Sequence, residues 1–211
     1  MIFLNRFEAG KKLANKLLNS LDFSSNSSLV VLAIPRGGVI IGSQLSSALK
    51  CSLEVIVTKK IGAPGDSELA IGAVGPIGEP VIDEALVARL GVDENYLKSK
   101  ILNLKSELAN HLKEYRGDKP PLDLKNKVVV ITDDGVATGA TMKAAIEILR
   151  QENPQKIVVA VPVIARDALK EIENLADEVI YLEAPELFFA VGQFYQNFEQ
   201  VSDEKVKELL K

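Results

Sequence analysis

Five short runs rich in apolar residues predict β-strands, and stretches with helical periodicity lie between them. The runs lie at 29–34, 53–58, 128–131, 157–163 and 178–182. Runs of this length and composition are typical of strands that are covered on both faces. Because helices are expected between consecutive strands, the pattern predicts an α/β protein with a doubly wound, mainly parallel five-stranded sheet flanked by helices.

The segments with helical periodicity place apolar residues three and four positions apart. Residues 5–20 form one amphipathic pattern, and Asn5 and Glu8 are spaced like a capping box at its start. Asp93 is a candidate N-cap for a long helix over 93–116. Further helices are expected from 37 to about 50, after Thr141, over 166–175 and from about Ser202.

The stretch 59–78 has no clear period, and it contains five glycines and two prolines. This composition predicts a long mobile loop with at most a short hairpin, and loops of this length in compact domains usually have a function. Residues 22–28, rich in Ser and Asn, are a second predicted loop. We therefore expect a single domain over 1–211, with a flexible loop at about 59–78 and a helical insert at about 84–117.

Composition and charge narrow the classes of function. A net charge of -4 argues against a nucleic-acid groove, because phosphate backbones select basic faces. No run of about 18 apolar residues exists, so no membrane span is expected. The single cysteine, Cys51, allows no internal disulfide, and the N-terminus does not resemble a signal peptide. We expect a cytoplasmic protein with no nucleic-acid or membrane partner.

The segment 128–141, VVVITDDGVATGAT, carries the chemistry. An apolar strand leads to two carboxylates, Asp133 and Asp134, and then to a loop of small and hydroxylic residues before a helix. In an open parallel sheet, ligands bind beyond the carboxyl ends of the strands, and amides at a helix start attract anions. The predicted phosphate contacts are Ala137, Thr138, Gly139, Ala140 and Thr141. A phosphate site beside carboxylates that can bind vicinal hydroxyls predicts a ribose 5-phosphate ligand.

This segment resembles the signature of type I phosphoribosyltransferases, which bind 5-phosphoribosyl 1-diphosphate (PRPP). The resemblance implies that Asp133 and Asp134 contact the ribose hydroxyls and that residues 137–141 enclose the 5-phosphate. Thr132 is one residue more than the signature has between the apolar run and the acidic pair. The alternative interpretation is a helix N-cap after a buried strand, which does not require the whole segment.

Pro35-Arg36-Gly37-Gly38, at the end of the first predicted strand, resembles the pyrophosphate loop of the same family. In that loop a basic residue precedes glycine. A non-proline peptide bond, which is often cis, turns amides toward the diphosphate. The resemblance implies that Arg36 supplies charge and that Gly37 and Gly38 allow close approach. Alone, the motif favours a plain strand-to-helix turn, but its order and distance relative to the segment 128–141 favour the pyrophosphate loop.

The loop at about 59–74 corresponds to the flexible lid with which this family covers its active site. A lid excludes water from a reactive cation and so prevents hydrolysis of PRPP. Lys59 and Lys60 either neutralise the diphosphate or are solvated surface lysines, and the sequence does not distinguish these. The single histidine, His111, is expected to be solvated on the polar side of the long helix, and Cys51 is expected to be a core or near-surface thiol.

The resemblance implies an enzyme of the glycosyltransferase type that transfers a pentosyl group. It would use Mg²⁺ to transfer ribose 5-phosphate from PRPP to a nitrogen acceptor and release pyrophosphate, and the expected acceptor is a nucleobase or related heterocycle. The expected catalytic residues are Asp133, Asp134 and Arg36, and Mg²⁺ would be held mainly by PRPP and water without direct protein ligands. Ala137 replaces the acidic residue of 6-oxopurine enzymes, which counts against hypoxanthine or guanine as the acceptor.

Three points stay open at this stage. Phe189, Phe194 or Tyr195 could stack on an acceptor base under a hood, or these aromatics could pack the tail onto the sheet. The helix 93–116 could be part of a hood or a homodimer contact. The rival functions are a non-catalytic PRPP sensor or regulator and, more distantly, a phosphatase-like nucleotide-binding domain.

Overall fold

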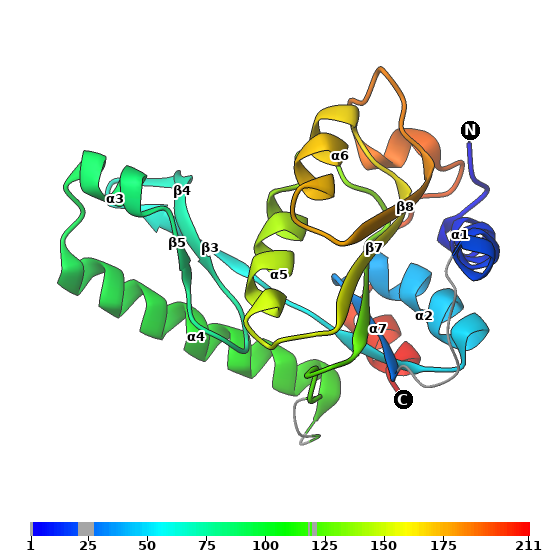
Figure 1. Cartoon of the computed structure of the whole chain (residues 1–211), viewed down its shortest axis with the longest axis horizontal. Helices are drawn as coiled ribbons and strands as arrows, with labels where there is room; N and C mark the ends of the chain where they lie inside the picture. Colours follow the sequence, from blue (N-terminus) through cyan, green and yellow to red (C-terminus); the bar gives the residue numbers. More distant parts are fainter. Residues whose placement is uncertain (1, 21–27, 118, 120–121) are drawn as a thin grey trace.

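The computed structural model describes residues 2–20, 28–117, 119 and 122–211. Its centre is a five-stranded parallel sheet in the order β2-β1-β6-β7-β8, from which an arm projects to one side (Figure 1). The strands of this sheet are β1 (Leu29–Ala33), β2 (Ser52–Val55), β6 (Val128–Thr132), β7 (Lys156–Val163) and β8 (Glu178–Glu183). The doubly wound sheet and its five strands are therefore confirmed.

Helices cover both faces of this sheet (Figure 1). On one face, α1 (Arg6–Ser20) and α2 (Gly37–Leu49) pack Leu13, Leu17, Ile41 and Leu45 against buried strand residues such as Val130. On the other face, α5 (Ala140–Arg150) and α6 (Arg166–Glu173) pack Ile146, Leu149 and Ile172 against residues such as Ile131. Because both faces are buried, the strands need apolar side chains at consecutive positions, which explains their continuous apolar sequences.

The arm consists of a second, antiparallel sheet and two helices. The sheet has the order β3-β4-β5, with β3 (Lys59–Ala63), β4 (Asp66–Val74) and β5 (Val81–Ile82). The helices are α3 (Glu84–Leu90) and α4 (Glu94–Arg116). Apolar residues of the hairpin, among them Ile61 and Ile71, are fully buried against Leu104 and Leu108 of α4. The arm thus has a small apolar core of its own.

The prediction of a long loop over 59–78 is wrong, because most of this segment forms the hairpin of β3 and β4. Its glycines are not signs of mobility. A Cβ on Gly62 would lie 2.8 Å from the Cα of Ser67, and a Cβ on Gly72 would overlap the carbonyl oxygen of Val81. These glycines allow close backbone approach in a bulged hairpin. They also interrupt the alternation of apolar and polar residues by which a strand is predicted from sequence.

The predicted helix starts are confirmed. The Oδ1 of Asn5 accepts a hydrogen bond from the amide of Glu8, and the side chain of Asp93 accepts from the amides of Asn95 and Tyr96. Thr132 is the last residue of β6, so the acidic pair follows the strand directly. The short C-terminal helix is α7 (Asp203–Leu209). The loop predicted at 22–28 lies almost wholly outside the described residues. None of the described helices is long and apolar enough to cross a membrane.

Candidate functional site

The two sequence motifs meet at one edge of the central sheet. β1 and β6 are neighbours, with Ala33 beside Thr132, so the segments that follow both strands leave the same edge. From β1 the chain continues to β2 on one side, and the sheet extends through β6 on the other. The gap between β1 and β6 is therefore a topological switch point, which is where open α/β sheets bind their ligands.

The loop after β6 forms a cradle at the start of α5. Gly139 is the N-cap of α5 with φ 76°, a backbone conformation that favours glycine. Val136 anchors the loop through hydrogen bonds to Val163 and Ala165, of 2.9 Å each. The small and hydroxylic residues around Gly139 line a cavity of ≈ 190 Å³ that Asp133 also borders: Ala137, Thr138, Ala140 and Thr141. Since first-turn amides have no partner within the helix, this cavity suits an anion.

The acidic pair lies beside this cradle and is largely removed from water. The amide of Asp134 donates a 2.7 Å hydrogen bond to the Oδ1 of Asp133. Burial, and then the charge of Asp134, raise the pKa of Asp133 well above its ordinary value. Burial also raises the pKa of Asp134, while the Arg6 guanidinium opposes that rise. Holding two ionised carboxylates here is costly without a ligand or a counter-ion.

The counter-ion of Asp134 comes from the N-terminal helix, and sequence analysis missed it. The Nε of Arg6 lies 2.7 Å from the Oδ2 of Asp134, and both side chains are largely buried, with 9% and 13% exposed. In the sequence, nothing distinguishes Arg6 from the other charged residues of the predicted amphipathic helix. No local sequence signal connects it to a residue 128 positions away.

The loop after β1 packs directly on the acidic pair. The peptide bond between Pro35 and Arg36 is cis, as the resemblance implied. A Cβ on Gly38 would lie 2.8 Å from the Cα of Asp133 and 2.9 Å from the carbonyl oxygen of Thr132. Glycine is therefore required here by packing against the acidic pair, in addition to any approach of a ligand.

Arg36 is exposed, and its guanidinium faces the C-terminal helix, with Nη1 lying 3.8 Å from the Oδ2 of Asp203. The hydroxyl of Tyr115 donates a 2.6 Å hydrogen bond to the Oδ1 of the same aspartate. The Nε2 of His111 lies 3.0 Å from that hydroxyl, and the two rings are 4.7 Å apart. His111 is thus half-buried and contacts Tyr115 of the same helix, so the prediction of a fully solvated side chain is wrong. Cys51 is partly buried, as predicted.

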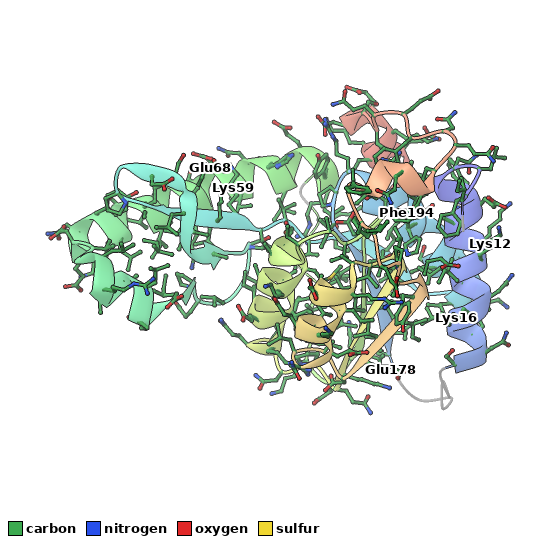
Figure 2. The ribbon with its side chains drawn as sticks, turned by 90° about the horizontal axis from the view of Figure 1, so that it is seen from above. Lys12, Lys16, Lys59, Glu68, Glu178 and Phe194 are labelled. Carbon is green, nitrogen blue, oxygen red and sulfur yellow. The ribbon has the colours of Figure 1, made fainter. Side chains whose placement is uncertain are left out.

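Lys59 and Lys60 lie on β3, and both are engaged by carboxylates of the arm. Lys59 pairs with Glu107 of α4, and the Nζ of Lys60 lies 2.8 Å from the Oε2 of Glu68. Figure 2 shows Lys59 and Glu68 on the arm, separated from Phe194 in the body of the protein. The structure thus brings Gly37 and Gly38 onto the acidic pair, whereas the guanidinium of Arg36 faces Asp203 and Lys59 has a separate partner.

The aromatic residues of the tail divide into two groups. Phe194 and Tyr195 are buried, and Phe194 packs on Phe188 with ring centroids 5.0 Å apart. The Tyr195 hydroxyl donates a 2.6 Å hydrogen bond to the carbonyl oxygen of Asp134. These two residues therefore fix the tail to the sheet. Phe189 is 84% exposed and, of the three candidates, is the one open to a ligand.

An anion cradle, a partly buried acidic pair and a glycine loop, all at the switch point of a parallel sheet, are the features of α/β proteins that bind phosphorylated ligands. The comparison with known families identifies the particular family. The chain matches the phosphoribosyl transferase domain over residues 4–199 and belongs to that family. Its fold is that of type I phosphoribosyltransferases.

Two named relatives agree with this assignment, and one solved structure is similar over the whole chain. A Mycobacterium tuberculosis protein provisionally named phosphoribosyl transferase is 37% identical over 209 residues, which is 99% of this chain and 46% of that protein. This chain thus spans about half the length of that relative. The uracil phosphoribosyltransferase of Sulfurisphaera tokodaii is 26% identical over 163 residues, covering 77% of this chain and 67% of that protein. The crystal structure of TT1426 from Thermus thermophilus is 38% identical, with a TM-score of 0.86, and covers 100% of this chain and 98% of that one.

Proposed function

We propose that this protein transfers ribose 5-phosphate from PRPP to a nitrogen acceptor, with Mg²⁺, and releases pyrophosphate. The observation that carries the proposal is the position of the acidic pair. Asp133 and Asp134 lie between the anion cradle of residues 137–141 and the glycine loop at Gly37, all at one sheet edge. PRPP has the same order of groups, a 5-phosphate, a ribose diol and a diphosphate.

Each part of the site then has one partner on PRPP. The amides and hydroxyls of residues 137–141 bind the 5-phosphate at the start of α5. Asp133 and Asp134 accept hydrogen bonds from the ribose hydroxyls, which favours their ionised forms once the ligand is present. Arg36 and the amides of Gly37 and Gly38 bind the diphosphate. As the C1–oxygen bond breaks, these donors stabilise the negative charge that develops on the departing pyrophosphate.

The carboxylates of the pair fit a magnesium site that is shared with the ligand. Oxygen donors suit Mg²⁺, which usually keeps several waters and binds through one or two carboxylates plus substrate phosphates. Asp133 forms no ion pair among the described residues, and its carboxylate has acceptor positions for waters of such an ion besides the one that binds the Asp134 amide. When bound, Mg²⁺ neutralises charge on the diphosphate and makes it a better leaving group.

The arm is the proposed lid. Its hairpin and α4 share an apolar core, so the arm would close as one unit. Lys59, at the root of the hairpin, would exchange Glu107 for the diphosphate on closure. The single-cysteine composition supports the cytoplasm as the site of the reaction.

The acceptor is proposed to be a nucleobase or related heterocycle that stacks on Phe189. Its ring is 84% exposed, and Val191, two residues further along the chain, lines the cradle cavity. An exposed aromatic ring is suited to stacking on a base. The uracil specificity in the name of the Sulfurisphaera tokodaii relative supports a pyrimidine. Ala137 offers no carboxylate for the proton handling that 6-oxopurines require.

Incubating the protein with Mg²⁺, PRPP and a panel of nucleobases, while measuring pyrophosphate release, tests the proposal. We expect release that depends on one acceptor and is lost in Asp134→Asn. Tight PRPP binding without release for any acceptor would instead indicate a sensor. Equal affinity for PRPP and ribose 5-phosphate, again without turnover, would point to a phosphatase-like or nucleotide-binding domain.

A further inference from the structure

Arg6 connects three parts of the chain at the acidic pair. Its Nε binds Asp134, and its Nη1 donates a 2.8 Å hydrogen bond to the carbonyl oxygen of Glu199 in the tail. Its guanidinium carbon lies 3.8 Å from the ring centroid of Phe198, which is close enough for a cation–π contact. Only 8% of Arg6 is exposed. Such a side chain has one available orientation, because each of its contacts restricts the same planar group.

Burial of the acidic pair makes a fixed cation necessary. Among the described residues, Arg6 is the only cation that forms an ion pair with either Asp133 or Asp134. A buried carboxylate without a partner takes up a proton or turns toward water, and in either case it binds the hydroxyls of a ligand less well than a carboxylate that is ionised and correctly oriented. One guanidinium N–H uses only part of the capacity of a carboxylate, which has about four acceptor positions. Asp134 can therefore bind Arg6 and a ribose hydroxyl together.

We propose that Arg6 is a positioning residue for the sugar subsite, which holds the Asp134 carboxylate in the orientation that binds the ribose diol. The inference rests on the proposed function and adds a residue from outside both sequence motifs. It also gives the tail a role, since Glu199 and Phe198 hold Arg6 from the other side. The N-terminal helix and the tail would thus be required for sugar binding although neither contacts the sugar.

Titrations with three ligands separate this role from general stabilisation of the fold. Arg6→Gln is titrated with PRPP, ribose 5-phosphate and inorganic pyrophosphate in the presence of Mg²⁺. The first two ligands contain the ribose diol and the third does not. We expect the affinities for PRPP and ribose 5-phosphate to fall by a similar factor, roughly 10- to 100-fold, as is usual when a group that orients a ligand-binding side chain is lost. The affinity for pyrophosphate should stay within about twofold of wild type.

Two further variants serve as controls. Lys12→Gln removes an exposed cation from the same helix, one that pairs with Glu8, and should leave all three affinities unchanged. Arg6→Lys keeps the charge but lacks the planar group that spans Asp134 and Glu199, so its affinities should be intermediate. Circular dichroism and thermal unfolding establish that each variant is folded before its titrations are compared.

A double-mutant cycle tests whether Arg6 acts through Asp134. If it does, adding Arg6→Gln to Asp134→Asn produces little further loss of ribose 5-phosphate affinity, whereas independent effects would add. Three results for a folded Arg6→Gln variant would overturn the inference and leave the proposed function intact. They are wild-type affinities for all three ligands, a higher affinity for ribose 5-phosphate, and a loss of pyrophosphate affinity equal to the loss of sugar affinity. A wild-type protein that binds neither PRPP nor ribose 5-phosphate would overturn both.

Discussion

Gly37 and Asp134 lie so close together that a Cβ atom on Gly37 would overlap the Oδ2 of Asp134. The same Cβ would lie 3.0 Å from the Nε of Arg6. The loop after β1 therefore closes over the Arg6–Asp134 ion pair, and glycine is the residue that leaves room for it. This contact joins the two sequence motifs physically, because a change in either loop displaces the other.

Replacing Gly37 with alanine should therefore disturb the sugar subsite as well as the diphosphate loop. We expect Gly37→Ala to weaken PRPP binding by about 10-fold or more, because an overlap with a buried group typically costs about 1–3 kcal/mol. The measurement is a calorimetric titration with PRPP. Gly91→Ala, at the C-cap of α3 with φ 62° and open space around the added Cβ, is the matched control for a helix-end glycine. Gly91→Ala should lower stability slightly and leave PRPP affinity unchanged. Equal PRPP affinity in the two variants would contradict the predicted overlap between residue 37 and Asp134.

Neutralising Asp133 should stabilise the ligand-free protein while destroying sugar binding. Burial raises the pKa of Asp133 above its ordinary value of 3.8. The stability associated with the protonated form is complete below the unfolded-state pKa and is lost as the pH rises through the folded-state pKa. Above its ordinary pKa, ionising Asp133 therefore costs more in the folded protein than in the unfolded chain, so this carboxyl lowers stability. Asp133→Asn should raise the melting temperature at pH 7.5 by about 2–4 °C for each kcal/mol gained.

The pH dependence distinguishes this effect from a change in packing. The difference in melting temperature between Asp133→Asn and wild type should shrink as the pH is lowered toward the ordinary Asp range, because the cost of the ionised Asp133 in the folded protein then disappears. A variant that is less stable than wild type at pH 7.5 would show that the carboxylate is not strained. Such a gain in stability on removing a functional group is a common trade-off at active sites.

Phe189 should matter for the acceptor and not for the fold. Its side chain is 84% exposed, so Phe189→Ala should change the free energy of unfolding by no more than about 0.5 kcal/mol. The KM for the acceptor should rise roughly 10-fold, since base stacking contributes about 1–3 kcal/mol, while the KM for PRPP should be unaffected. Leu187→Ala, in the same segment and 70% exposed, is the matched control. Identical acceptor kinetics in the two variants would argue against stacking.

The Cys51 thiol should react slowly with alkylating reagents in the folded protein. Burial raises the pKa of its thiol to about 11, so the thiolate is scarce at pH 8. Alkylation by iodoacetamide at this pH should be at least about 10-fold slower in the native protein than in denaturant, because the thiolate is the reacting form. Mass spectrometry of timed samples gives both rates. Equal alkylation rates in the native and the denatured protein would show that the Cys51 thiol is exposed to water.

Much of the central sheet follows from local pattern. Consecutive apolar residues such as Val128 to Ile131 give buried strands, and the caps at Asn5 and Asp93 mark helix starts. The extent of the hairpin over β3 and β4 was underestimated, because its glycines serve close backbone approach, which in a single sequence has the same appearance as flexibility.

The site was predictable only where its parts are continuous in sequence. Asp133, Asp134 and the cradle lie within one segment, and the Pro35 to Gly38 loop is another. Arg6 and Asp203 reach the site through tertiary packing of α1 and α7, and the orientation of a charged side chain on a helix is not encoded locally. The single histidine illustrates the same limit, since its contact with Tyr115, one turn further along α4, was not predicted.

A crystal structure of the protein with PRPP and Mg²⁺ tests the central claim most directly. We predict that the 5-phosphate lies at the start of α5, within hydrogen-bond distance of amides in residues 137–141, and that both ribose hydroxyls face Asp133 and Asp134. Density for the 5-phosphate at any other place, or a ribose directed away from the acidic pair, would contradict the account.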